Sequence, residues 1–570
     1  MNNSIIDTKP TILSSDVLII GGGGAACRAA IEAYDQGASV QMIVKGNFGN
    51  SGCTLYVGTS AAVGPWAMDE DSNDISLKDL VSYGGFLANQ DLARILIDET
   101  LDRVTEMDDW GIEFLRDENG DIIPHKSAEH TYPRNFTFTS SRSSNHEYGS
   151  PPGIAMMDVL IEQVRAREIS VLDNVALVDL ICIDGKVIGA LGIDIQSGTY
   201  ITLRSKATVL ATGTYSQIFS PTTVSMGETG DGHSAAFTVG ADLIDMECSQ
   251  FVASTTSHLL GATFINARGE AFVENYGTNV SPDVAKEDLV YAIAKEMKAG
   301  GATKRGTLFL DLREPLRDEA VASNFLKHFR QRMKYDPVSA INKDIDPRTT
   351  LVETSPAAHT TIGGIRINSR CETNISGLYA AGSVAGGIYG LARPEGYTSM
   401  ITLVFGRRAG VFASNYANHQ NDQIVDTSLE SELVRQSKSL VSNKSGSNPD
   451  HVKASVRNVL REFGWVIKDE AGLKKGLEEI RKISDANSTF TGSSGKEIVN
   501  SFEAKNMLLT AELLLLGSLD RKESRGAFFR DDYPSKDDDN YLCNIVYKSD
   551  NGTITLEHNV PDFKHVMPYI

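Results

Sequence analysis

The stretch from Asp16 to Ala30, DVLIIGGGGAACRAA, decides the fold class of this chain. Its apolar run is followed by four glycines and then by small residues, a pattern that predicts a β-strand, a tight turn and the start of an α-helix. In the spacing G-x-G-x-x-A, Gly21 allows the turn, Gly23 lets the backbone approach a pyrophosphate, and Ala26 fills the third small position. The phosphates would lie at the positive end of the helix. A glycine-rich turn can be purely structural, but the strand and helix around this one favour nucleotide binding.

The composition narrows the classes of function. A length of 570 residues predicts two to four domains. The 74 acidic and 54 basic side chains leave a net charge of -20, which argues against a nucleic-acid partner and fits a solvated acidic surface. The six cysteines show no C-x-x-C spacing, so we expect neither a metal site nor iron–sulfur ligands within the chain. Because no signal sequence and no membrane-spanning apolar run are found, we expect a cytoplasmic protein without a direct membrane span.

Further strand and glycine elements indicate that the nucleotide domain is discontinuous. The second predicted strand ends in Lys45, where an NAD-binding fold would usually carry an acidic residue, and this counts against NAD. Residues 207–214 (ATVLATGT) and 377–387 (GLYAAGSVAGG) repeat the pattern of a strand followed by glycine. About 100 residues between them, from Phe251 to Glu353, fit a small inserted α+β lid. Its predicted elements are strands at 263–266 and 307–311 and a helix at 286–297.

The remainder of the chain predicts a helical region. Residues 420–448 are polar and rich in serine, which is typical of a linker. Apolar residues then recur at helical spacing from Val452 to Ile480. The chain closes with a hairpin predicted around Asp550-Asn551-Gly552. The predicted domains are the first part of the nucleotide domain (1–250), the capping lid (251–353), the second part of the nucleotide domain (354–420), a helical domain (421–520) and a C-terminal segment (521–570).

Seven motifs occur in an order that resembles one protein family. They are DVLIIGGGGAACRAA, ATVLATGT, TGDGHSAA, HTTIGGI, GLYAAGSVAGG, FGRRAG and RKESRGAFFRDDYPSKDDDNYL. The same order is found in the flavoprotein subunits of succinate dehydrogenase and fumarate reductase, in L-aspartate oxidase and, more distantly, in adenylylsulfate reductase. The resemblance covers nearly the whole chain. It implies an α/β fold with a discontinuous Rossmann-like FAD-binding domain, an inserted α+β capping domain and a helical C-terminal domain.

The resemblance also implies an extended FAD and the residues that hold it. Respiratory members of the family attach FAD through the histidine of an S-H-T motif, but this chain reads Ser51-Gly52-Cys53-Thr54 there. We therefore predict a non-covalent FAD. Ser383 stands where the family normally has a flavin-binding Glu. The implied cofactor-binding residues are Gly21, Gly22, Gly23, Gly24, Ala25, Ala26, Lys45, Ser51, Gly52, Thr54, Gly213, Asp231, Gly382, Ser383, Ser399 and Met400.

Only half of the family's substrate site is matched. His359 and Arg393 stand at positions that bind a carboxylate or carbonyl oxygen in the family, and together they could hold one anion. The second histidine and the Thr-Glu pair are missing, and an alignment that keeps Asp288 places Glu287 at the position of the catalytic arginine. Glu287 is a candidate proton donor, with a solvated helix residue as the favoured alternative. Arg313, Tyr397 and Glu395 are further candidates.

The leading interpretation is an FAD-dependent oxidoreductase that reduces, or reversibly dehydrogenates, a carbon–carbon bond next to a carboxylate or carbonyl of a small anionic substrate. Because the chain has no cluster ligands of its own, an iron–sulfur subunit or other electron carrier is the expected partner. Three alternatives stay open. They are an amino-acid oxidase like L-aspartate oxidase, an enzyme like adenylylsulfate reductase, and an electron-transfer flavoprotein subunit with a degenerate substrate site.

Overall fold

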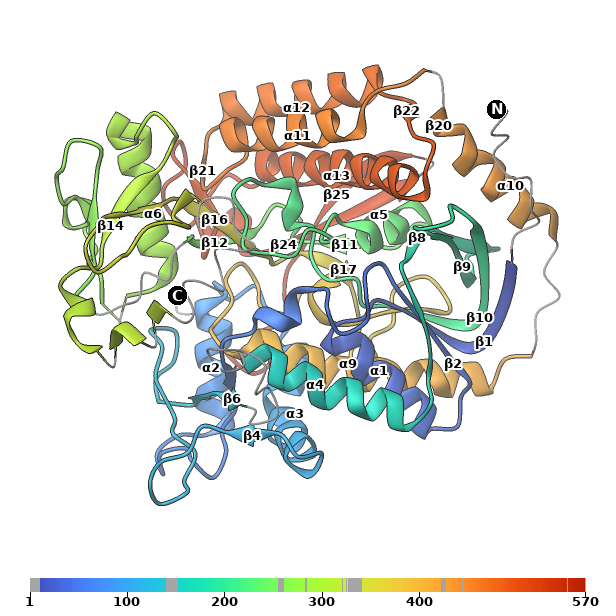
Figure 1. The fold of residues 1–570 in the computed structure, drawn as a ribbon, viewed down its shortest axis with the longest axis horizontal. Coiled ribbons are helices and arrows are strands. Elements are labelled where there is room, and N and C mark those ends of the chain that lie inside the picture. The colour runs from blue at the N-terminus through green and yellow to red at the C-terminus, as the bar shows by residue number, and fades with distance from the viewer. Residues whose placement is uncertain are drawn as a thin grey trace.

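Strand β1 (Thr11–Ile20) lies inside a seven-stranded sheet and ends at the glycine turn (Figure 1). The computed structural model describes residues 11–139, 152–254, 261–281, 284–319, 321–323, 325–326, 341–421, 427–442, 445–550 and 552–568. Strand β1 pairs in parallel with its two neighbours, β2 and β10. The other strands of this sheet are β2 (Val40–Val44), β7 (Ser170–Asp173), β8 (Val175–Ile183), β9 (Lys186–Asp194), β10 (Tyr200–Leu210) and β18 (Leu378–Ala380). The parallel pairing of segments far apart in the sequence confirms the predicted α/β fold class.

Helix α1 (Gly24–Asp35) follows the glycine turn and packs against α9 (Tyr397–Asn418). Glycines make this close contact possible. A Cβ at Gly406 would lie 2.8 Å from the Ala25 oxygen, and one at Gly410 would lie 2.5 Å from the Ala29 oxygen. Helix α4 (Pro152–Ala166) packs on α1 as well. A helix from late in the chain thus supports the first helix.

An excursion after β2 carries helices and short strands. Its elements are β3 (Ser60–Ala61), α2 (Asn73–Tyr83), α3 (Gln90–Asp109), β4 (Glu113–Phe114), β5 (Asn135–Phe136) and β6 (Phe138–Thr139). Arg134 is fully buried here and pairs with Asp71 at 2.7 Å and with Asp79 at 2.8 Å. These ion pairs join α2 and the residues before it to the segment that leads into β5. They thereby help to fix the position of α2, including its last residues.

A second, five-stranded sheet brings together the middle and the end of the chain. It contains β11 (Leu243–Ile244), β17 (Gly364–Arg366), β19 (Ala385–Gly386), β24 (Asn544–Asp550) and β25 (Thr553–Asn559). The pairing of β24 with β25 confirms the predicted hairpin, and Asn551 of its predicted turn lies outside the described residues. Because β24 pairs with β11, the C-terminal segment completes a sheet that begins in the middle of the chain. Two short helices, α5 (Asp231–Thr238) and α14 (Asp538–Tyr541), lie in these parts of the chain.

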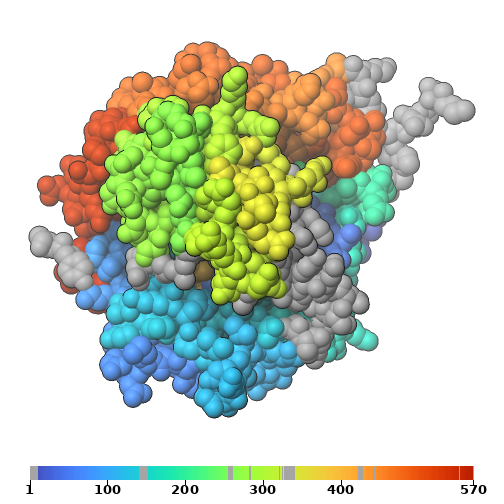
Figure 2. Space-filling model, turned by 60° about the vertical axis from the view of Figure 1, so that its left-hand side comes forward, coloured from blue at the N-terminus to red at the C-terminus, as the bar shows by residue number. Residues whose placement is uncertain are grey.

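The inserted segment forms a lobe with its own apolar core. Its elements are β12 (Ser249–Ala253), β13 (Thr263–Ile265), α6 (Lys286–Glu296), β14 (Leu308–Asp311), β15 (Val352–Thr354) and β16 (Pro356–Thr361). Phe264, Leu310 and Val352 are buried in that core. Strand β12 pairs with β16 and links the lobe to the rest of the molecule. In Figure 2 the lobe appears in green to yellow, between the orange helical region and the blue N-terminal excursion.

The helical region contains α10 (Thr427–Ser439), α11 (Pro449–Phe463), α12 (Glu470–Ala486) and α13 (Gly495–Asp520). Short strands accompany them, namely β20 (Val441–Ser442), β21 (Ile467–Lys468), β22 (Phe490–Thr491) and β23 (Phe529–Arg530). The linker predicted at 420–448 is wrong over α10. Glu430 of α10 is buried and pairs with Arg204 at 2.8 Å, and such a tertiary contact is invisible in a polar composition.

No helix in the described parts of the chain is long and apolar enough to cross a membrane.

Candidate flavin and substrate site

The glycine turn has no room for side chains. Gly21 has a φ of +135°, and a Cβ there would lie 2.2 Å from the Ala211 oxygen. A Cβ at Gly22 would lie 2.7 Å from a methyl group of Val44. Gly23 caps α1 without any side-chain hydrogen bond. The turn therefore presents bare backbone at the positive end of a twelve-residue helix, which is the geometry that binds a pyrophosphate.

Three predicted cofactor residues from other segments surround this turn. The Gly24 N–H donates to the Thr54 hydroxyl oxygen at 3.0 Å, so the polar loop after β2 lies against the cradle. A Cβ at Gly382 would lie 2.8 Å from the Ala25 Cβ. Gly213, with a φ of +79°, would place a Cβ 2.1 Å from the buried Glu228 carboxylate. The contacts of Thr54 and Gly382, together with that of Ala211 at Gly21, bring to this turn three segments that are widely separated in the sequence.

Lys45 lies at the end of β2 among acidic and polar groups. Its Nζ pairs with Asp231 at 2.8 Å and with Glu503 at 2.6 Å, and it donates to Thr229 at 2.9 Å. Burial alone would lower the pKa of Lys45, but the two carboxylates raise it above its usual value. Lys45 and Asp231 are therefore brought together, and Glu503 of α13 is an addition that the sequence pattern did not indicate.

The remaining predicted cofactor residues lie at the start of α9 and in two turns. The buried Ser399 hydroxyl lies 2.8 Å from the Ser60 hydroxyl and donates to the Gly396 oxygen at 2.8 Å. Met400 is fully buried, whereas Ser383 is half-buried. In the loop after β2, Ser51 donates to the Asn47 oxygen at 3.1 Å, and Gly52 has a φ of +91°.

The residues present fit FAD. The side-chain-free turn would hold the pyrophosphate, and the loops of Thr54, Gly213 and Gly382 converge on it from separate strands. When bound, the flavin supplies two-electron redox chemistry by hydride transfer at its N5 atom. The described residues contain no group of histidine, cysteine or acidic side chains able to hold a metal ion. All six cysteines are free thiols.

Arg393 is buried beside Gln250. The Arg393 Nε donates to Gln250 Oε1 at 3.1 Å, and Gln250 Nε2 donates to the Arg393 backbone oxygen at 3.2 Å. The Arg393 residue is 6% exposed, yet it forms no ion pair with any carboxylate that the structure describes. A buried cation without a counter-ion is costly, so the two Nη groups are suited to an anionic ligand.

Glu287 is buried, contrary to the expectation of a solvated helix residue. It is 6% exposed and accepts hydrogen bonds from the Tyr83 hydroxyl and from Gln250 Nε2. The helix turns this face of α6 toward β12 because its neighbours Leu289 and Val290 also pack inward. Burial raises the pKa of the Glu287 carboxyl above its usual value, against the opposing effect of Lys286 and the two donors. Glu287 and the Arg393 guanidinium are thus both hydrogen-bonded to the Gln250 side chain.

The neighbouring groups extend this buried cluster. Burial and the Glu287 charge raise the pKa of Tyr83 well above its usual value. Tyr83 Oη also lies 3.5 Å from Glu129 Oε1, and Glu129 pairs with Lys286 at 2.8 Å. Burial opposes ionisation of Glu129, but Lys286 overcomes it and holds the pKa of Glu129 at about 2.

His359 lies on β16, next to Thr360, which is paired across the ladder with Gln250. Its Nδ1 lies 2.8 Å from the Thr223 hydroxyl, which fixes the orientation of the half-buried ring. His359 and Arg393 are therefore linked through the strand pair β12 and β16 and through the Gln250 side chain.

The other candidate proton donors do not join this cluster. Arg313 is 51% exposed and pairs with Asp311 of its own segment at 2.7 Å. The fully buried Tyr397 hydroxyl meets the Ser76 hydroxyl. The Glu395 backbone oxygen lies 2.9 Å from His130 Nε2. Of the four candidates, Glu287 is the one that shares a hydrogen-bonding partner with Arg393.

Sequence reasoning missed four residues of the site: Tyr83, Glu129, Gln250 and Lys286. Tyr83 ends α2 and Glu129 lies in a loop, and nothing in their local sequence marks them. A signal existed for two of them. Gln250 begins the segment QFVAS at 250–254, where the second histidine of the family is missing, and Lys286 precedes Glu287 at the start of a predicted helix.

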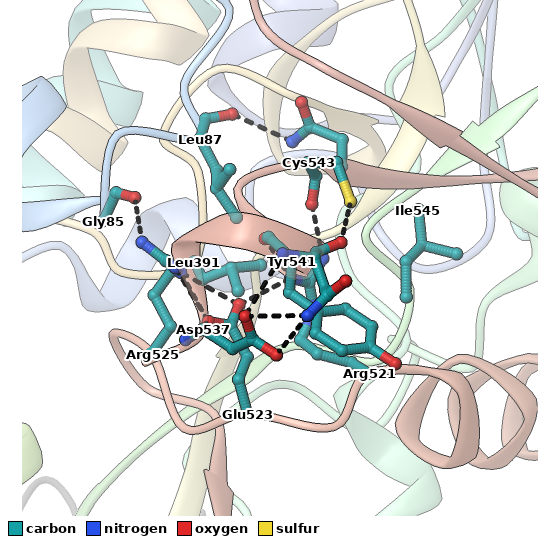
Figure 3. A network of polar contacts seen from close by, with 12 residues as sticks. Gly85, Leu87, Leu391, Arg521, Glu523, Arg525, Asp537, Tyr541, Cys543 and Ile545 are labelled. Atoms are coloured by element: carbon teal, nitrogen blue, oxygen red, sulfur yellow. Dashed lines mark hydrogen bonds and ion pairs between the residues drawn. The ribbon is translucent and has the colours of Figure 1, made fainter. Parts of the chain in front are cut away.

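A buried ionic network from the C-terminal motif holds the segments that carry the site (Figure 3). Arg525 donates to the Gly85 oxygen at 3.1 Å and pairs with Glu523 at 2.7 Å. Glu523 also pairs with Arg521 at 2.9 Å. The Leu391 oxygen accepts from the Ala527 N–H at 2.8 Å. The network therefore reaches within two residues of both Tyr83 and Arg393.

Comparisons with known proteins agree with this geometry. A family described as FAD binding domain matches residues 16–399, and one described as fumarate reductase flavoprotein C-term matches residues 453–569. The chain belongs to the FAD-binding flavoprotein family of fumarate reductase and succinate dehydrogenase. It is an FAD-dependent oxidoreductase of the fumarate reductase type, and the predicted family and the predicted use of FAD are confirmed.

Relatives within this family differ in what they act on. The A subunit of fumarate reductase (CoM/CoB) from Methanothermobacter marburgensis is 32% identical over 547 residues, covering 91% of this chain and 94% of the relative. L-aspartate oxidase of Streptomyces coelicolor is 25% identical over 585 residues, covering 97% and 94%. The structure of Mycobacterium smegmatis Sdh1 in complex with UQ1 has a TM-score of 0.86 at 26% identity, covering 97% and 95%.

Proposed function

We propose that this flavoprotein reduces a carbon–carbon double bond next to the carboxylate of a small organic acid. The observation that carries the proposal is the buried Arg393, whose Nε is held by Gln250 while no described carboxylate neutralises it. Arg393 would hold the substrate carboxylate with two parallel hydrogen bonds, and His359 would contact it from β16. This orients the double bond toward the flavin.

The surrounding residues support reduction of an enoate over oxidation of an amino acid. Reduction of a double bond needs one hydride, supplied by the bound flavin, and one proton at the neighbouring carbon. A buried carboxyl group with a raised pKa, Glu287, lies beside the residue that positions Arg393. We further propose that the FAD is non-covalent and that a separate iron–sulfur subunit or other carrier delivers the electrons.

The test uses the FAD-loaded protein, reduced with dithionite under anaerobic conditions and mixed with fumarate, crotonate or cinnamate. Reoxidation of the flavin by at least one of these acids is expected. The variant Arg393→Ala should keep its FAD. It should need an acceptor concentration about 30-fold or more higher than wild type to reach half of its maximal reoxidation rate. Arg305→Ala is the matched control, because Arg305 is 64% exposed on the inserted lobe. Reduction of the oxidised flavin by L-aspartate, with no reoxidation by any enoate, would contradict the proposal.

A further inference from the structure

A continuous line of polar side chains leads from Arg393 into the inserted lobe. Gln250 joins Arg393 to Glu287, with the Arg393 Nε at 3.1 Å from Gln250 Oε1 and Gln250 Nε2 donating to Glu287. Glu287 then accepts from the Tyr83 hydroxyl. The three segments that supply these groups, α2, β12 and α6, are held together by tertiary contacts.

The line continues from Tyr83 toward solvent. Tyr83 Oη lies 3.5 Å from Glu129 Oε1, and Glu129 Oε1 lies 2.8 Å from Lys286 Nζ. The Lys286 side chain is 10% exposed, whereas the Glu129 side chain is 3% exposed. Lys286 is therefore the end of the line that meets water.

A second glutamate of α6, Glu296, also accepts from a tyrosine and shows what a structural pair looks like. The buried Glu296 accepts from the Tyr276 hydroxyl at 2.9 Å, and it also pairs with Arg268 at 2.9 Å. Glu287 forms no such ion pair with any described residue, although it is equally buried. Keeping a carboxyl group buried without a salt bridge is costly, and apolar packing would be more stable.

We propose that Glu287 delivers the proton to the substrate and that Tyr83, Glu129 and Lys286 form the path that replaces it. The inference rests on the proposed reduction of a carboxylate-bearing double bond. Glu287 supplies a proton to one carbon of the double bond, and the hydride for the other carbon, which carries both electrons, would come from the bound FAD. One H₂ equivalent is added and Glu287 is left as a carboxylate.

After the reaction, one proton must pass from water to the Glu287 carboxylate. Tyr83 gives its proton to the Glu287 carboxylate, and the phenolate so formed takes one from Lys286 through the bridging Glu129 carboxylate. Lys286 then regains a proton from water. The second transfer is favourable because burial and the Glu129 charge make the Tyr83 phenolate more basic than a free tyrosinate, even after Glu287 has been protonated.

Burial and the neighbouring charged and polar groups together set the pKa of Glu287. Burial favours the protonated acid, as does the charge of Glu129, while the hydrogen bonds from Tyr83 and Gln250 and the charge of Lys286 favour the carboxylate. Arg393 lies beyond Gln250 and acts on Tyr83 as well. A bound substrate carboxylate would neutralise Arg393 and shift Glu287 further toward the protonated form.

The first experiment follows the carbonyl stretch of protonated carboxylic acids by infrared difference spectroscopy of the FAD-loaded protein during pH titration. Wild type should keep a protonated carboxyl at pH values where an ordinary glutamate, with a pKa of about 4.3, has lost its proton. One carbonyl band should be missing in Glu287→Gln and present in Glu296→Gln. The bands of other buried acids with raised pKa values, such as Asp245 and Glu228, should be common to wild type and both variants. A wild-type spectrum that contains no band removed by Glu287→Gln would overturn the inference.

Two phenylalanine variants test the path. Tyr83→Phe removes a donor to the carboxylate and should move the Glu287 titration to higher pH, whereas Tyr276→Phe should leave it unchanged. In flavin reoxidation by fumarate, crotonate or cinnamate, Glu287→Gln should slow the step by about 100-fold or more, and Glu296→Gln by less than about threefold. Tyr83→Phe should slow repeated turnover more than the first turnover.

The outcomes separate the two proposals. If no enoate reoxidises wild-type flavin, the proposed function fails, and the infrared titration still decides whether Glu287 holds a proton. If an enoate reoxidises wild type and Glu287→Gln at equal rates, the proposed function stands and Glu287 is not the proton donor. A slow Glu287→Gln that binds the acceptor with unchanged affinity supports both.

Discussion

Arg525 donates a hydrogen bond from Nη1 to the backbone oxygen of Gly85 at 3.1 Å, two residues after Tyr83 (Figure 3). The same guanidinium pairs with the buried Glu523 at 2.7 Å. A motif near the end of the chain thereby holds the turn that follows α2. Since Tyr83 is the last residue of α2, the position of its hydroxyl depends on this contact.

Arg525→Ala should therefore lower the free energy of unfolding by about 3 kcal/mol or more, because it leaves Glu523 and the Gly85 oxygen buried with fewer partners. Denaturant unfolding measures the change. The control is Arg370→Ala, since Arg370 is 58% exposed in its pair with Glu372 and should cost less than about 1 kcal/mol. Equal effects of the two variants would mean that the buried network contributes little.

Gly21→Ala should prevent FAD uptake. A Cβ at this position would lie 2.2 Å from the Ala211 oxygen, so the turn would have to move away from the phosphates. Flavin absorbance per polypeptide measures the occupancy. Gly185→Ala is the control, because Gly185 has a φ of +73° with nothing near its Cβ position. It should keep full FAD and lose only about 1 kcal/mol of stability. Full occupancy in Gly21→Ala would refute the assigned cradle.

The FAD should leave the protein on acid denaturation. The loop after β2 has Gly52 and Cys53 in the place of the histidine that attaches flavin in respiratory members, and the Cys53 thiol is occupied by the Ser225 N–H at 3.4 Å. Burial also raises the pKa of Cys53, which disfavours the reactive thiolate. Flavin in the supernatant after precipitation is the expected result, and flavin fluorescence that stays with the denatured polypeptide would contradict it.

Lys468→Met should stabilise the protein at pH 7. Burial lowers the pKa of Lys468 from 10.5 to about 8, so at pH 7 the folded state carries a buried charge that the unfolded state exposes to water. The cost is fully present below pH 8 and disappears as the pH rises toward 10.5. The variant should gain about 1 to 3 kcal/mol at pH 7 and almost none near pH 10.5. A gain that does not change between these pH values would show that packing, rather than charge, causes it.

Several features of this protein were determined by the sequence alone. Gly21 to Ala26 can form a phosphate cradle because only residues without bulky side chains fit the turn, and this constraint is local. The strand and glycine elements at 207–214 and 377–387 carry the same local signature. The order of the motifs identified the family, and the periodicity after Val452 predicted the helices. The hairpin at 550–552 followed from its turn residues.

The tertiary structure decided the rest. Glu287 looked like a solvated helix residue because Lys286, Glu287 and Asp288 are all charged, and only the packing of α6 against β12 buries it. Helix α10 is held against β10 by the pair of Glu430 with Arg204, a contact between residues 226 positions apart. Tyr83 and Glu129 likewise join the site through contacts with residues far away in the sequence, Glu287 and Lys286. Burial and pairing depend on which distant segments meet, and a local sequence pattern holds no record of that.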